Sequence, residues 1–363
     1  MSSNRVNQLL MNNRVIVFAG SGGVGKTTTA AALAAHGAQL GKRVVVITID
    51  PAKRLADALG MSGSLTNEPS RIEITAAGEL WATMLDTRTT FDALIHRYSS
   101  TKEQAERIIT NRFYKNISGA LSGTQEYMAA EKLYDLYSDP RFDVVIVDTP
   151  PTRQALDFLS APARLTRFIN HPLYRVLIAP ASAGMKVIGT LTQPVLRTIS
   201  KVIGTQALDD TVEFFQAFQG LDVGFRDRAD AVAKVLRNTF TQYILVSTPQ
   251  PDAMNETLFF VDALRAENIE PALLLLNRMQ PKFVDQEPVD TRSLTPDLLV
   301  PLQENLAECI QRTNSQEAVA QQFSKSAPKV PVVRIPFSTA LLDEPEKTLE
   351  TLCSLGALMA SAD

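Results

Sequence analysis

The sequence predicts an α/β fold with a doubly wound, mostly parallel β-sheet, on the basis of three observations. Short β-branched and apolar runs recur along the chain, stretches of helical character separate most of them, and a glycine-rich loop joins the first run to the first helix. Nearly continuous apolar runs are typical of parallel strands buried on both faces, and their alternation with helices is typical of a doubly wound sheet. The predicted strands are Val15–Ala19, Val44–Ile49, Arg71–Thr75, Leu80–Leu85, Val144–Val147, Tyr243–Ser247, Ala272–Leu276 and Val332–Ile335.

Two long stretches carry no strand signal, at about residues 88–140 and 153–238. Both have helical patterns, so we expect one domain over residues 1–363 with a helical subdomain formed by two insertions. In the first insertion, Ser122 and Gln125 have the spacing of a capping box and predict a helix to about Tyr137.

Composition limits the class of protein. The net charge is −3 and no run of five or more basic residues occurs, which argues against a nucleic-acid partner. The two cysteines have no metal-site spacing and fit a reducing cytoplasm. No stretch of 18 apolar residues is present, and the polar first 13 residues lack the apolar core of a signal peptide. We therefore expect a cytoplasmic protein without a membrane span.

The glycine-rich loop matches Gly-x4-Gly-Lys-Ser/Thr and lies between an apolar strand and an Ala/Leu-rich helix. This is the P-loop pattern, in which glycines let backbone N–H groups point at phosphate and the helix N-terminus adds partial positive charge. Lys26 is expected to reach the β- and γ-phosphates of a nucleoside triphosphate, and Thr27 to bind Mg²⁺. The candidate nucleotide-binding residues here are Gly20, Ser21, Gly22, Gly23, Val24, Gly25, Lys26, Thr27 and Thr28.

Two carboxylates follow apolar strands at the sheet edge where α/β proteins bind ligands. Asp148 ends the run Val144–Val147 and has the usual form of a metal-shell carboxylate, and Asp50 ends the run Val44–Ile49. Phosphoryl transfer to water needs one group to orient the water and another to hold the Mg²⁺ shell. The alternative for each aspartate is that it caps the next helix.

The glycine loop, Asp50-Pro51-Ala52 and Asp148-Thr149-Pro150-Pro151-Thr152 together resemble the ArsA-type ATPases, which include arsenite-pump ATPases and ATPases that target tail-anchored membrane proteins. The resemblance covers the nucleotide-binding sheet and implies a P-loop NTPase fold that binds ATP and Mg²⁺. It implies that Asp50 positions the hydrolytic water, with Lys26 as the other candidate catalytic residue. It also implies that Asp148 begins a switch loop and holds Mg²⁺, possibly through water.

The resemblance further implies that Asn277 reads the adenine edge and that the Pro336–Leu342 stretch covers the base. An Asn amide can donate and accept hydrogen bonds at once, which suits adenine.

The departures from the family pattern are informative. Ser21 stands where the family usually has a second lysine that reaches the partner subunit's phosphates. Cysteines that would bind arsenite, or zinc between subunits, are absent, so arsenite pumping and a zinc-clamped dimer are not expected. Lys53, Arg54 and Arg153 are candidates to replace the missing cation, and the hypothesis is that Arg153 or Lys53 does so. The alternatives are that Arg153 faces solvent or pairs with Asp157, or that a different partner chain supplies a lysine.

The second insertion contains an apolar arc from Ile188 to Val202 and aromatic residues at Phe214, Phe215 and Phe218. Three interpretations stay open: packing within the subdomain, a groove for a hydrophobic protein client, and contact with a membrane surface. The expected function is Mg²⁺-dependent ATP hydrolysis that drives a conformational switch in a dimer acting on an unidentified client. The alternative is a weakly hydrolysing, nucleotide-sensing subunit that pairs with a paralogous ATPase.

Overall fold

The computed structural model describes residues 5–50, 54–61, 63–117, 124–150, 157–172, 174, 205–281, 295–337 and 348–361. The chain forms two compact units, a sheet unit of residues 1–84, 139–156 and 239–363 and a helical unit of residues 85–138 and 157–238. Within the described residues, no helix is long and apolar enough to cross a membrane.

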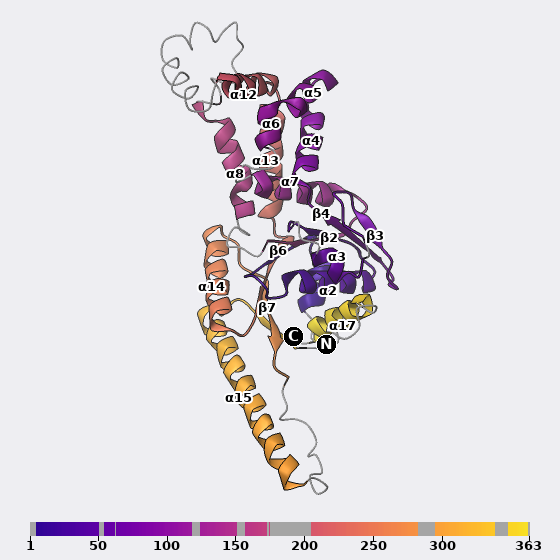
Figure 1. The fold of residues 1–363 in the computed structure, drawn as a ribbon, viewed down its shortest axis with the longest axis vertical. Helices are drawn as coiled ribbons and strands as arrows, with labels where there is room; N and C mark the ends of the chain where they lie inside the picture. The colour runs from indigo at the N-terminus through magenta and orange to yellow at the C-terminus, as the bar shows by residue number, and fades with distance from the viewer. Residues whose placement is uncertain are drawn as a thin grey trace. The chain divides into compact units, whose positions relative to one another are not determined.

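The sheet unit is built on one eight-stranded sheet in the order β3-β4-β2-β5-β1-β6-β7-β8 (Figure 1). All neighbouring strands are parallel except β3, which is antiparallel to β4. The α/β fold class with a mostly parallel sheet is therefore confirmed. The strands are β1 (Val15–Ala19), β2 (Arg43–Thr48), β3 (Ser70–Ile72), β4 (Glu79–Met84), β5 (Val144–Asp148), β6 (Thr241–Ser247), β7 (Leu273–Met279) and β8 (Val332–Pro336).

Each predicted strand has a counterpart, but two boundaries differ in an informative way. The edge strand β3 is shorter than the predicted Arg71–Thr75 run, since it pairs with β4 over three residues only. Strand β7 continues three residues beyond Leu276, because a register shift between Leu276 and Met279 lets it resume pairing with β8. Asn277 therefore lies inside an irregular strand end and not after it.

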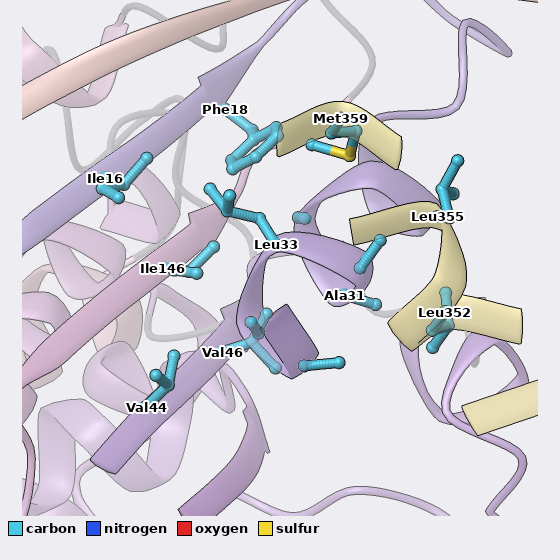
Figure 2. Close-up of a cluster of buried hydrophobic side chains, with 14 of the residues drawn as sticks. Ile16, Phe18, Ala31, Leu33, Val44, Val46, Ile146, Leu352, Leu355 and Met359 are labelled. Atoms are coloured by element: carbon cyan, nitrogen blue, oxygen red, sulfur yellow. The ribbon is translucent and has the colours of Figure 1, made fainter. Parts of the chain in front are cut away.

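The core of the sheet unit is aliphatic. Helix α2 is buried on the sheet, with every residue from Ala30 to Ala35 fully buried. Figure 2 shows α17 on the other side of α2, with Leu352, Leu355 and Met359 in the same cluster as Leu33 and Phe18. The two helices approach closely at Gly356, where an added Cβ would lie 2.6 Å from the Ala32 carbonyl oxygen. The helices of this unit are α1 (Arg5–Asn12), α2 (Lys26–Gln39), α3 (Arg54–Ala58), α14 (Pro251–Ala266), α15 (Pro296–Ser326) and α17 (Thr348–Ser361).

The core of the helical unit is rich in aromatic side chains. Phe214 and Phe218 have ring centroids 5.5 Å apart, and Phe218 lies 5.0 Å from Phe225. Phe214, Phe215 and Phe218 are all buried, so these three rings pack inside the unit. The helices are α4 (Thr87–Tyr98), α5 (Lys102–Thr110), α6 (Arg112–Ile117), α7 (Thr124–Ser138), α8 (Asp157–Ile169), α12 (Thr205–Ala217) and α13 (Asp222–Leu236).

Several predictions fall outside the described residues and stay predictions. They concern Lys53, Arg153, the capping residue Ser122, the apolar arc from Ile188 to Val202, and the part of the base loop that follows Phe337.

Candidate functional site

The glycine loop lies between the end of β1 and the start of α2, as its sequence requires. Gly25 has φ +96°, and a Cβ there would lie 2.3 Å from the Asn277 side-chain nitrogen. At Gly20 a Cβ would lie 2.2 Å from the Val246 carbonyl oxygen. At Gly20 the backbone of the neighbouring strand β6 leaves no room for a side chain, and at Gly25 the positive φ and the nearby Asn277 amide both favour glycine. Gly22 and Gly23 are exposed at the tip of the loop.

Lys26 is the first residue of α2 and its ammonium is held inside the loop. Its Nζ donates to the carbonyl oxygens of Gly20 at 2.9 Å and Ser21 at 2.7 Å. Burial lowers the pKa of Lys26 to about 8, while the charge of Asp148 acts in the opposite direction. The ammonium therefore stays largely protonated at pH 7, and a phosphate group would further favour its charged form.

Asp148 lies in register between Thr48 on β2 and Phe18 on β1. Its Oδ2 accepts hydrogen bonds from Thr27 Oγ1 at 2.8 Å and Thr48 Oγ1 at 3.1 Å. Its Oδ1 is buried and has no hydrogen-bond partner among the residues that the structure describes. Burial raises the pKa of this carboxyl to about 6, against the hydrogen bonds from Thr27 and Thr48.

The unpartnered Oδ1 is the test of whether a metal ion fits this site. A buried carboxylate oxygen without a donor carries a desolvation cost unless a cation or donor meets it. Mg²⁺ is usually held by one or two protein oxygens together with phosphate and water. Asp148 and the Thr27 hydroxyl offer oxygen ligands of that kind. The residues present therefore fit a divalent cation bound with a nucleotide.

Asp50 follows β2 at the same sheet edge. Its Oδ2 accepts a hydrogen bond from Arg54 at 3.0 Å, and its backbone N–H donates to Thr48 Oγ1 at 3.3 Å. The carboxylate is 17% exposed, which leaves it accessible to water while it pairs with a cation on α3. The structure thus places Asp50, Asp148 and the glycine loop together on the adjacent strands β2, β5 and β1.

Asn277 also lies at the loop, on its other side. Its Nδ2 donates to the Val24 carbonyl oxygen at 2.9 Å, and its Oδ1 accepts from the backbone N–H of Arg278 at 2.9 Å. The amide therefore fastens the end of β7 to the glycine loop. Its expected role toward adenine stays a prediction, and one Nδ2 hydrogen remains for it. Thr28 is half-buried on α2, with no contact that bears on its role.

Sequence reasoning missed three residues that shape the site. Thr48 shares Asp148 with Thr27, and Thr149 ties β5 to β1 because its Oγ1 donates to the Phe18 carbonyl oxygen at 2.6 Å. Arg278 adopts a left-handed backbone conformation beside the loop. Thr149 belongs to the motif that begins at Asp148, but nothing in that motif indicates its contact with β1. No local motif marks Thr48 or Arg278, because their positions follow from strand order and register.

A P-loop after β1, with carboxylates after the neighbouring strand β5 and the next strand β2, defines a nucleoside triphosphatase of the P-loop class. A family model described as anion-transporting ATPase matches residues 13–340, and the chain belongs to that family. The chain is accordingly an ATPase, and the family implies a bound nucleotide with a divalent metal.

Individual relatives match over most of their length. A protein of Aquifex aeolicus (strain VF5), provisionally named arsenical pump-driving ATPase 1, is 25% identical over 95% of this chain and 78% of its own. The ATPase get3 of Schizosaccharomyces japonicus (strain yFS275 / FY16936) is 23% identical over 88% of this chain and 86% of its own. The ATPase ASNA1 homolog 1 of Paramecium tetraurelia is 26% identical over 80% of this chain and 87% of its own.

Proposed function

We propose that this ATPase uses Mg²⁺, with Asp50 as the residue that orients the attacking water. The observation that supports the proposal most strongly is the buried Asp148, which keeps one oxygen without a partner beside Lys26 and Thr27. A fully buried carboxylate with a raised pKa next to a phosphate loop is suited to a metal–nucleotide complex.

Each residue has a distinct part in the proposed reaction. The N–H groups of the glycine loop and the Lys26 ammonium bind the β- and γ-phosphates, and phosphate oxygens replace the two loop carbonyls as partners of Nζ. Thr27 and Asp148 hold the metal ion, which when bound neutralises charge on the phosphates. Asp50 accepts a hydrogen bond from water and orients it, and the pairing with Arg54 fixes the carboxylate.

The hydrolytic cycle would serve as a conformational switch in a dimer that acts on a protein client. Support for a protein partner comes from α15, whose first half exposes Leu298, Val300, Leu302 and Leu306 by 46–58%. Exposed apolar residues gathered on one segment mark sites of protein interaction. A cytoplasmic location, and no partnership with nucleic acid, stay predictions.

A second candidate is a nucleotide-sensing, weakly hydrolysing subunit that pairs with a paralogous ATPase. The observation that favours it is Ser21, whose side chain is buried and carries no charge toward a partner's phosphates. A homodimer of this chain would need another cation in that place, and Lys53 and Arg153 are the proposed substitutes. Turnover of the purified chain alone, compared with turnover in the presence of a paralogue, separates the two candidates.

The test of the proposed chemistry is Asp50→Asn. The amide keeps the shape but is a far weaker acceptor, so ATP should bind with near wild-type affinity while turnover falls by about 100-fold or more. The matched control is Asp57→Asn, an exposed aspartate on α3, which should leave both quantities unchanged. Affinity is measured by calorimetric titration and turnover by phosphate release.

Two results would count against the assignment. Unchanged turnover in Asp50→Asn would remove Asp50 from the chemistry. Loss of binding and turnover together would make Asp50 a structural or metal-shell residue.

A further inference from the structure

Arg54 is the cation that lies next to Asp50 at the sheet edge of the candidate site. It is the first residue of α3, and its Nη1 donates to Asp50 Oδ2 at 3.0 Å. In phosphoryl transfer, negative charge spreads over the γ-phosphoryl oxygens, and a fixed cation beside them lowers the barrier. Lys53 and Arg153, the other cations considered for this role, lie outside the described residues. The surroundings of Arg54 therefore indicate whether it could meet the γ-phosphate.

A continuous set of hydrogen bonds connects Arg54 and Asp50 with the glycine loop. The Asp50 N–H donates to Thr48 Oγ1 at 3.3 Å, and this hydroxyl donates in turn to Asp148 Oδ2 at 3.1 Å. The same Oδ2 accepts a hydrogen bond from Thr27 Oγ1 at 2.8 Å. Arg54 and Asp50 therefore lie beside the two residues proposed to hold the metal ion with the terminal phosphates.

The charge of Arg54 also acts on Lys26. Burial lowers the pKa of Lys26 to about 8, the charge of Asp148 acts in the opposite direction, and the positive charge of Arg54 lowers the pKa further. The two cations therefore repel each other in the ligand-free protein. A polyphosphate bound by Lys26 would be attracted by both cations, so their arrangement favours a ligand with several negative charges.

The guanidinium keeps donors for a ligand while it holds Asp50. It carries several N–H donors in a planar fork, and among the described residues it donates only to Asp50, through Nη1. The Arg54 side chain is 60% exposed, whereas that of Asp50 is 17% exposed. Nε and Nη2 can therefore bind a phosphate oxygen without loss of the contact that fixes the Asp50 carboxylate.

We propose that Arg54 is a catalytic residue that binds the γ-phosphate of the nucleotide held by its own chain. Nη1 keeps Asp50 in place, and the remaining donors contact the γ-phosphoryl oxygens and offset the negative charge that develops on them during hydrolysis. The chain then needs no cation from a partner for turnover. This inference rests on the proposed function, and it assigns to Arg54 the part considered for Lys53 and Arg153.

The first experiment compares ATP and ADP, which differ by the γ-phosphate, in the presence of Mg²⁺. Calorimetric titration is carried out on Asp50→Asn and on the double variant Asp50→Asn/Arg54→Ala. In this background the ion pair is already absent, so an effect of Arg54 that passes through the Asp50 carboxylate cannot appear. The double variant should bind ATP about tenfold more weakly or worse than Asp50→Asn does, because a hydrogen bond between charged groups is lost. Both proteins should bind ADP equally well.

The second experiment measures turnover at saturating ATP by phosphate release. Arg54→Gln retains an N–H donor for Asp50 but has no charge, and it should lower turnover by about 100-fold or more. The matched control is Arg71→Ala on β3, because Arg71 is also 60% exposed and has one carboxylate partner, Glu79, at 3.4 Å. Arg71→Ala should match wild type in turnover and in the affinity for both nucleotides.

Four results would overturn the inference. Equal loss of ATP and ADP affinity in the double variant would show that Arg54 does not contact the γ-phosphate. Unchanged ATP affinity relative to Asp50→Asn, or wild-type turnover in Arg54→Gln, would make Arg54 a positioning residue that acts through Asp50. Turnover that returns when Arg54→Ala is mixed with Lys26→Ala would show that the guanidinium acts on the nucleotide of a partner chain.

Lys26→Ala separates failure of the proposed function from failure of the inference. If Lys26→Ala binds ATP as tightly as wild type, the glycine loop is not the phosphate site, and both fail together. If Lys26→Ala loses ATP binding and Asp50→Asn loses turnover, while the double variant binds ATP as tightly as Asp50→Asn, only the inference about Arg54 is overturned.

Discussion

Each unit of the molecule contains a buried carboxylate. One of the two is paired with a buried cation, and the other is not. Glu131, on α7 of the helical unit, is 0% exposed and accepts a hydrogen bond from Arg228 Nε at 2.6 Å. Arg228 also bonds Asp135, and its guanidinium lies 3.9 Å from the ring centroid of Tyr134. Asp148, in the sheet unit, is 1% exposed; within the described part of the chain, Oδ2 has only hydroxyl donors and Oδ1 has no partner.

The difference separates a structural charge from a functional one. Burial raises the pKa of both carboxyls, because removal from water penalises the charged form in each case. In the helical unit, the guanidinium of Arg228 pairs with the buried Glu131 and offsets this penalty. In the sheet unit, one oxygen of Asp148 is left for a ligand to bind. Without that ligand, the desolvation of the carboxylate lowers the stability of the protein.

The largest expected effect tests the structural charge. Arg228→Ala leaves Glu131 buried without its main partner and should lower the free energy of unfolding of the helical unit by about 3–5 kcal/mol. Urea denaturation followed by far-UV circular dichroism measures it, and fluorescence of Trp81, the single tryptophan, on β4 follows the sheet unit separately.

The control for this variant is Arg107→Ala in the same unit. Arg107 lies 3.8 Å from Glu213, and both side chains are about 60% exposed, so its loss should cost no more than about 1 kcal/mol. Equal effects of Arg107→Ala and Arg228→Ala would show that burial of the ion pair does not matter.

The second prediction concerns the functional charge. Asp148→Asn removes a desolvated carboxylate whose pKa is raised by burial from 3.8 to about 6, which corresponds to about 3 kcal/mol of lost stability at pH 7. The ligand-free variant should therefore be as stable as wild type or more stable, by up to that amount. Thermal denaturation without nucleotide measures it; destabilisation as large as that of Arg228→Ala would remove the distinction between the two charges.

The smallest effect concerns His36 on α2. Its Nε2 lies 2.7 Å from Asn7 Oδ1, and burial lowers its pKa below 6.5, against a weaker opposite effect of Gln39. The unfolded chain then binds more protons below about pH 6.5, so this residue makes stability rise with pH up to that value. The difference in unfolding free energy between wild type and His36→Gln should grow from pH 5 to pH 7. A difference that shrinks as pH rises would mean that the folded protein favours the imidazolium.

The sequence was sufficient to place the strands, the glycine loop and both aspartates, because apolar runs and turn chemistry are local. It did not reveal that β3 is antiparallel, since direction depends on how an edge strand meets β4. Nor could it place Thr48 on Asp148, or Arg278 and Gly22 in the lining of one pocket. Those contacts depend on the order of β2, β5, β1 and β7, which no local pattern encodes.

The most direct test of the central claim is the effect of Mg²⁺ on ATP affinity in wild type and Asp148→Asn. If Oδ1 of Asp148 helps to bind the metal, Mg²⁺ should increase the affinity of the wild-type protein for ATP. The variant should lose most of this increase in affinity, about tenfold or more. It should still bind ATP without metal through Lys26. Titrations with Mg²⁺ and with excess chelator give both values for each protein. If Mg²⁺ increases the ATP affinity of Asp148→Asn as much as that of wild type, the account is contradicted, because the Asp148 carboxylate would then not help to bind the metal.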